Sequence, residues 1–147
     1  HPIGAHIQQK YKLPILSCGC GLVGCLEKYI SGPGLAYLYS FFSEKENATA
    51  HECMDAYRKA EPVAIKAFSC YMDVLGSSFA SLVMDYDPDV IVIGGGISQL
   101  DEVLDALPTA IRPHVFKGIN IPVIARAKFG DSSGVRGAAI LGGQLCN

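Results

Sequence analysis

The spacing of apolar residues divides the chain into a helical first half and a second half in which strands and helices alternate. Apolar side chains recur every three or four positions over 35–42 and again over 62–86, which is the period of a helix with one buried face. Pro62 suits the start of the longer helix because no backbone N–H is needed there, and Pro88 follows its end. Shorter helices are expected at 6–12, 27–29 and 51–59.

The second half predicts a strand–helix–strand–helix unit. Within 89–98, a run of β-branched residues lies between a proline and three glycines, which predicts a strand buried on both faces, as in a parallel sheet. A helix over 99–112 and a second strand over 120–128 follow, joined by a right-handed crossover. The class is α/β. A last helix is expected, with Asp131 or Ser132 as its N-cap and with small residues that permit close packing at Gly134, Gly137, Ala138 and Ala139.

Composition narrows the classes of function. The 147 residues suffice for one domain with a core, half of them are apolar, 18% are charged, and the formal net charge is −2. No basic stripe favours a nucleic-acid partner, and no uninterrupted apolar run approaches the ~18 residues of a membrane span. Three of six cysteines are clustered and the others isolated, which is typical of a metal site in the reducing cytoplasm. Cys70 lies in a helical pattern and is expected in the core.

The clustered cysteines, Cys18, Cys20 and Cys25, are separated by glycines that permit a tight loop. Such a loop can direct three sulfur ligands to one point, which leaves one position of a tetrahedral Zn²⁺ ion for a fourth donor. The glycines argue against buried structural cysteines, the close spacing argues against disulfides, and an iron–sulfur cluster usually takes four cysteines. Zinc is therefore predicted. Two upstream histidines could complete the site, His1 and His6.

The cysteine segment, Cys18-Gly19-Cys20-Gly21-x-x-Gly24-Cys25-x-Glu27, resembles the zinc motif of the ROK family (repressors, open reading frames, kinases). The following Tyr29-x-Ser31-Gly32-x-Gly34-x-Ala36-x-Leu38-Tyr39 is similar to the bacterial N-acetylglucosamine kinase branch. The resemblance covers essentially the whole chain, but only the second half of such a protein. It implies that residues 1–147 are the C-terminal lobe of an actin-like (ribonuclease H-like) sugar kinase, with the N-terminal lobe outside this chain.

The resemblance assigns sugar contacts to Glu27 and His1. A carboxylate two residues after a zinc ligand is preorganised for hydroxyl groups, or it is a helix-start charge favoured by the dipole; in the family, the matching glutamate contacts the sugar. The family motif Glu-x-Gly-His ends in a histidine that binds zinc and touches the sugar. His1 matches it, although Pro2 follows at once where relatives often have one residue between. His51 and His114 are expected at the surface.

The three glycines Gly94, Gly95 and Gly96 follow the first strand, where open α/β sheets bind ligands. A dinucleotide fingerprint fails, because its last glycine is replaced by Gln99. A tight strand-to-helix turn would explain the glycines equally well from the residues alone. The resemblance implies that they close over the adenosine of ATP.

Three family motifs have no counterpart here: the Asp-x-Gly-Gly-Thr phosphate loop, the Gly-Thr-Gly loop and the Asp-Asn-Asp catalytic aspartate. No catalytic residue is therefore assigned within this chain. The resemblance implies transfer of phosphate from MgATP to the 6-hydroxyl of a hexosamine, with N-acetylglucosamine as the leading candidate, in a protein that holds a structural zinc ion. It also implies that the protein forms homodimers, or that this chain associates with its missing half. The alternatives are a sugar-responsive ROK repressor and a zinc-stabilised interaction module without activity.

Overall fold

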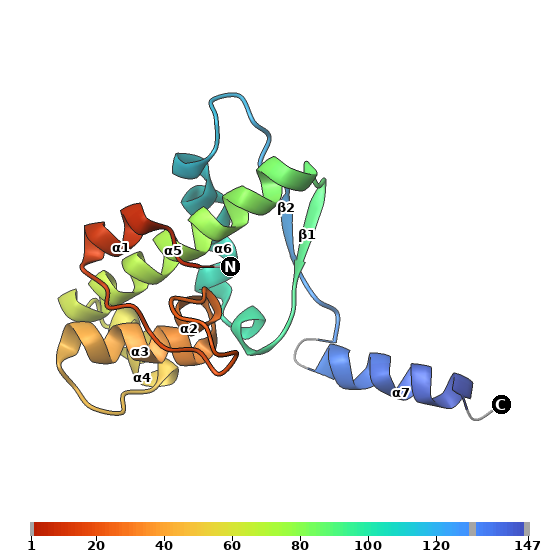
Figure 1. The fold of residues 1–147 in the computed structure, drawn as a ribbon, viewed down its shortest axis with the longest axis horizontal. Coiled ribbons are helices and arrows are strands. Elements are labelled where there is room, and N and C mark those ends of the chain that lie inside the picture. Colours follow the sequence, from red (N-terminus) through yellow and green to blue (C-terminus); the bar gives the residue numbers. More distant parts are fainter. Residues whose placement is uncertain (1, 130–131, 146–147) are drawn as a thin grey trace.

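The computed structural model describes residues 2–129 and 132–145 as a helical body, a small parallel sheet beside it and a C-terminal helix that stands apart (Figure 1). The helices are α1 (Ala5–Tyr11), α2 (Glu27–Ile30), α3 (Gly32–Ser43), α4 (Ala50–Arg58), α5 (Pro62–Tyr86), α6 (Asp101–Ile111) and α7 (Ser133–Leu145). The strands are β1 (Val90–Ile93) and β2 (Val123–Arg126), and short 3₁₀ turns are η1 (Gly96–Gln99) and η2 (Arg112–His114). The predicted helices are therefore confirmed, with ends shifted by a few residues.

Helix α5 is the centre of the body and contacts α1, α2, α3, α4, α6 and η2. Its buried face includes Tyr71 and Cys70, both fully buried, so the core position expected for Cys70 is confirmed. A Cβ atom on Gly76 would lie 2.2 Å from the carbonyl oxygen of Ala110, so glycine lets α6 pack directly on α5. By length and composition α5 could cross a membrane, but 56% of its most apolar 18-residue stretch is buried inside the structure. This burial is typical of the core helix of a globular domain.

The sheet confirms the predicted strand–helix–strand order but corrects the predicted burial. β1 and β2 pair in parallel, with Val90 opposite Val123, and α6 lies between them in sequence. Val90 is 50% exposed and Val92 61%, whereas Ile91 and Ile93 pack against the body. The strand is thus half-buried on one face and exposed on the other, because the described residues place helices on one side of the sheet.

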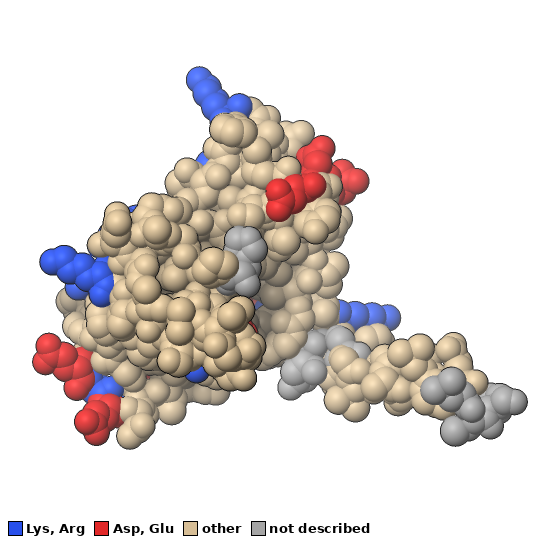
Figure 2. Space-filling model, in the orientation of Figure 1, with Lys and Arg blue, Asp and Glu red and all other residues tan. Residues whose placement is uncertain are grey.

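Helix α7 carries large apolar side chains that nothing in the described part of the chain covers. Val135 is 74% exposed, and Ile140 and Leu141 are exposed to 62% and 63%. Figure 2 shows a mostly uncharged surface along this helix. A Cβ atom on Gly134 or Gly137 would meet nothing within 4 Å, so no neighbour among residues 2–129 and 132–145 uses the close approach that these small residues permit. Of its two expected caps, Asp131 lies outside the described residues, and the Ser132 hydroxyl donates to the Phe129 carbonyl at 2.8 Å.

Candidate functional site

The thiols of Cys18, Cys20 and Cys25 converge on one point of the surface. Their Sγ atoms all lie within 4.8 Å of one another, and those of Cys20 and Cys25 are 3.5 Å apart. Zinc–sulfur bonds of about 2.3 Å at tetrahedral angles separate sulfur atoms by about 3.8 Å, so the spacing suits three corners of one zinc site. Within 2–129 and 132–145, no other three His, Cys, Asp or Glu side chains converge in this way.

The loop that carries these thiols is a tight hairpin. The Cys18 N–H donates to the Leu22 carbonyl at 2.9 Å, and the Gly21 N–H donates to the Cys18 carbonyl at 3.0 Å. Gly21 and Gly24 have φ angles of 87° and 69°, a region that side chains strain to enter. The glycines between the cysteines are thus what allows the chain to turn back and bring the thiols together.

Two histidines, His1 and His6, were predicted as candidates for a fourth zinc ligand. His1 lies outside the described residues, while Pro2 pairs with Cys25 in an antiparallel bridge. His6 lies on α1 beside His114, with ring centroids 6.0 Å apart, and it is not part of the thiol group. The structure therefore gives no support to His6 as the fourth ligand.

The thiols differ in how readily they ionise. A hydrogen bond from the backbone of Leu22, and then the neighbouring thiols, lower the pKa of Cys20, while Cys20 foremost raises the pKa of Cys25 to about 11. Burial instead raises the pKa of Cys53 to about 11 and of Cys70 to about 12. The thiolate is the form that binds metals, so the loop favours it at Cys20 and the core disfavours it.

Glu27 lies beside the thiol loop in a pocket of about 390 Å³. It is the first residue of α2 and lies between Cys25, whose carbonyl accepts from the Lys28 N–H at 3.0 Å, and Tyr29. The fully buried Tyr29 donates its hydroxyl to the Pro14 carbonyl at 2.8 Å and accepts from the Leu16 N–H at 3.1 Å. These bonds tie the chain before the loop to α2. The pocket is lined by Leu16, Ser17, Glu27, Lys28, Ser31, Pro33 and Tyr37.

The glycine turn opens onto a second pocket of about 300 Å³, which Gly96 lines. Gly95 has a φ of 73°, and a Cβ atom on Gly95 or Gly96 would meet nothing within 4 Å, so the backbone is accessible. Sequence reasoning missed the opposite wall, which α4 supplies, since no pattern links residues so far apart. The lining residues are Gly32, Ala50, His51, Gly96, Ile97, Gln99 and Leu100.

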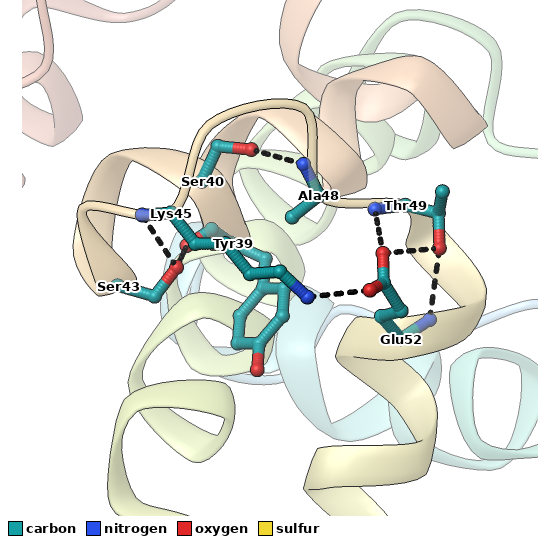
Figure 3. A network of polar contacts seen from close by, with 7 residues as sticks. All are labelled: Tyr39, Ser40, Ser43, Lys45, Ala48, Thr49 and Glu52. Atoms are coloured by element: carbon teal, nitrogen blue, oxygen red, sulfur yellow. Dashed lines mark hydrogen bonds and ion pairs between the residues drawn. The ribbon is translucent and has the colours of Figure 1, made fainter.

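A polar network fixes the start of α4 and with it that opposite wall (Figure 3). The Thr49 hydroxyl accepts from the Glu52 N–H at 3.1 Å, and the Glu52 carboxylate accepts from the Thr49 N–H at 2.8 Å, which is a capping box. Lys45 donates to the same carboxylate at 2.5 Å. The Lys45 ammonium first, and then the bonds from Thr49, lower the pKa of Glu52 to about 2.

The two pockets share one wall, the turn Ser31–Gly34. Ser31 and Pro33 line the pocket of Glu27, and Gly32 lines the pocket of the glycine turn. The Ser31 hydroxyl donates to the Glu27 carbonyl at 2.7 Å and accepts from the Gly34 N–H at 3.2 Å. A Cβ atom on Gly34 would lie 2.4 Å from the carbonyl carbon of Tyr29. The turn is therefore pinned against α2 and separates two neighbouring sites.

Comparison with known proteins places this arrangement in one family. The sequence is 48% identical over 143 residues to the N-acetylgalactosamine kinase AgaK of Shewanella sp. (strain ANA-3), covering 97% of this chain and 46% of that protein. It is 38% identical to the N-acetyl-D-glucosamine kinase of Vibrio cholerae, covering 95% of this chain and 46% of that protein. The chain thus spans about half the length of the curated relatives it matches.

A solved structure agrees with the sequence relatives. A ROK family glucokinase from Streptomyces griseus, in complex with glucose and AMPPNP, superposes with a TM-score of 0.74 at 26% identity, covering 84% of this chain and 46% of that one. The model of the ROK family matches residues 3–144 of the present sequence. The chain belongs to the ROK family.

Proposed function

We propose that this chain is the C-terminal part of a cytoplasmic ATP-dependent N-acetylhexosamine kinase, in which phosphate passes from MgATP to the 6-hydroxyl of the sugar. The observation that carries the proposal is the pair of pockets on either side of Ser31–Gly34. Phosphoryl transfer depends above all on holding two substrates side by side in fixed positions. The kinase names of the two relatives support this function over a repressor or an inactive zinc module.

Glu27 is the proposed sugar-binding residue. Its carboxylate lines the 390 Å³ pocket, is exposed, and has its backbone fixed between Cys25 and Tyr29. A carboxylate accepts hydrogen bonds from more than one hydroxyl group, which suits a ring that carries several. His1, which neighbours Pro2 in sequence, is proposed to contact the same sugar and to complete the zinc site.

The test of this role is Glu27→Gln in the intact protein, in a coupled assay with N-acetylgalactosamine, N-acetylglucosamine and MgATP. Loss of charge-assisted hydrogen bonds of ~1.5–3 kcal/mol predicts a sugar KM raised about tenfold or more, with the KM for ATP nearly unchanged. Glu44→Gln, an exposed glutamate after α3, is the matched control. Unaltered sugar kinetics in Glu27→Gln would show that Glu27 is only a helix-start charge.

The two relatives are named for different sugars. The relative at 48% identity is named for N-acetylgalactosamine and that at 38% for N-acetylglucosamine; these sugars differ only at the 4-hydroxyl. The same assay with both sugars therefore decides the substrate by the ratio of kcat/KM. Turnover of neither sugar would contradict the proposed function.

Zinc is proposed to be held by Cys18, Cys20 and Cys25, together with His1. The convergence of three thiols within 4.8 Å supports this set. The ion would fix the loop that precedes Glu27 and take no part in phosphate transfer. Since structural zinc contributes ~10 kcal/mol or more to folding, we expect one zinc per chain by elemental analysis and a large loss of thermal stability in Cys20→Ser. Ser17→Ala, one residue before the loop's first cysteine, is the control; a zinc-free protein would contradict the assignment.

The glycine turn is proposed to seat the adenosine of ATP. The pocket beside Gly96 is mostly apolar in its lining, and the open side of Gly95 lets a nucleotide approach the backbone. Gly94 completes the turn at the end of β1. The phosphate loops and the general base are expected in the part of the protein that this chain does not span, so residues 1–147 alone should not turn over substrate.

The uncovered face of the sheet suggests where the rest of the protein packs against this chain. Val90, Val92 and Val123 are 50%, 61% and 64% exposed, and Val135, Ile140 and Leu141 of α7 are exposed as well. The relatives are about twice as long as this chain. We therefore propose that the remainder of the protein packs on this face, and that complete proteins pair as homodimers.

A further inference from the structure

The pocket of Glu27 has an apolar wall that the proposed role of Glu27 leaves unused. Four of the side chains that line this pocket are polar and suit the hydroxyl groups of a sugar. The other three are Leu16, Pro33 and Tyr37. Because burial of apolar surface is favourable, this wall favours a ligand that carries an apolar group as well as hydroxyl groups.

Contacts between the elements bring these three side chains together. Pro33 and Tyr37 are four residues apart in α3, so they lie on the same face of the helix, one turn apart. The buried Tyr29 connects Tyr37 to the segment of Leu16. Its hydroxyl accepts from the Leu16 N–H at 3.1 Å, and its ring lies edge-on to the ring of Tyr37, with centroids 6.4 Å apart. We call Leu16, Pro33 and Tyr37 the apolar wall.

The ring of Tyr37 is held in place by two neighbouring aromatic rings. Tyr29 meets it at an interplanar angle of 81°, and Phe41, one turn later in α3, stacks on it at 23° with centroids 6.2 Å apart. Both separations lie in the range of favourable aromatic pairs. Since these contacts order the half-buried ring before a ligand arrives, binding against it costs little side-chain entropy.

We propose that the apolar wall, and Tyr37 above all, receives the methyl group of the N-acetyl substituent and so selects N-acylated hexosamines. This inference rests on the proposed sugar role of the Glu27 pocket and adds a specificity-determining residue to it. Ser31 joins the two parts, because its hydroxyl donates to the Glu27 carbonyl at 2.7 Å and caps the helix that carries Tyr37. A carboxylate for hydroxyl groups and a wall for a methyl group are thus held in one pocket.

The experiment compares sugars that differ by this one methyl group, the N-acetyl and N-formyl derivatives of galactosamine and of glucosamine, with the intact protein. Each sugar is measured by its kcat/KM with MgATP and by calorimetric titration, which needs no turnover. Since one carbon in an apolar pocket is worth ~10-fold or more, we expect the wild type to prefer the N-acetyl sugar by at least that factor. Tyr37→Ala should reduce the preference to about twofold or less, whereas Tyr37→Phe, which keeps the ring, should retain it.

Tyr57→Ala is the matched control. Tyr57 is half-buried, packs on the ring of Phe68 with centroids 4.4 Å apart, and does not line the Glu27 pocket, so its truncation should leave the preference unchanged. Because both sugars are measured with the same preparation, loss of folded protein cannot alter their ratio. The space left by the ring in Tyr37→Ala should also improve an N-butanoyl sugar relative to the N-acetyl one.

The outcomes separate this inference from the proposed kinase activity. A wild type without the N-acetyl preference, or a Tyr37→Ala variant that keeps it in full, would overturn the inference. Binding of the sugars with the expected preference but without phosphorylation would support the inference and contradict the kinase activity alone. Binding of none of the four sugars would contradict both.

Discussion

At the scale of single residues, glycines decide how closely elements approach. Gly34 brings α3 onto the backbone of α2, since a Cβ atom there would lie 2.4 Å from the Tyr29 carbonyl carbon. Gly32, two residues earlier, has room, because the nearest atom to its Cβ position is a side-chain carbon of Ile97 at 4.0 Å. Of two nearby glycines in one turn, position 34 thus excludes any side chain, whereas position 32 has room for one.

Gly34→Ala should therefore destabilise the protein by roughly 1–3 kcal/mol or more, the cost of forcing extra volume into a packed contact. Gly32→Ala should change the free energy of unfolding far less. Urea unfolding followed by circular dichroism compares the two directly. Equal losses from both substitutions would show that the α2–α3 contact does not depend on Gly34.

At the scale of elements, much of the fold was predictable and the reasons for the failures are physical. The period of apolar residues predicted α3, α5 and α6, because each buries one stripe against neighbours. The same pattern did not reveal that β1 leaves Val92 exposed, since a run of β-branched residues looks alike whether the covering layer is present or not. His114 was expected at the surface, and its partial burial against Asp73, 2.8 Å away, could not be predicted for a related reason: a lone histidine has no period, and Asp73 is far away in sequence.

The candidate site, too, was predictable in some parts and not in others. The thiol loop was predictable because its cysteines are close in sequence and separated by glycines. The second pocket was predictable only on its Gly96 side, because Ala50 and His51 reach it through the packing of α4. Whether these residues bind sugar, zinc and nucleotide stays a prediction until the variants above are measured.

The capping box of α4 predicts a dependence of stability on pH. The pKa of Glu52 falls from the ordinary 4.5 to about 2 on folding. Its carboxylate therefore stabilises the native state above pH 4.5, and this contribution is lost as the pH falls from about 4.5 towards 2. Thermal unfolding of Glu52→Gln should show a lower melting temperature than wild type at pH 6, with the difference shrinking towards pH 2. Glu46→Gln, in the preceding loop, is the control; a difference that is constant with pH would contradict the assignment.

At the scale of the whole molecule, the exposed apolar face of the sheet predicts where the remainder of the protein packs. Val92→Asp in the intact protein should lower the free energy of unfolding by several kcal/mol, because it would bury an unpaired charge. Val63→Asp in the first turn of α5, where an acidic side chain is tolerated, should have little effect. Similar, small effects from both would indicate that water covers this face in the complete protein as well.

The turn Ser31–Gly34 has a consequence for how two substrates would influence each other. Because its residues line both pockets, any ligand that displaces the turn from one side alters the shape of the other site. Thermodynamic linkage then requires reciprocity: whatever factor a sugar imposes on nucleotide affinity, the nucleotide imposes on sugar affinity. Rigid attachment of the turn to α2 through Gly34 would limit that displacement, and with it the strength of any coupling between the proposed sugar and nucleotide sites.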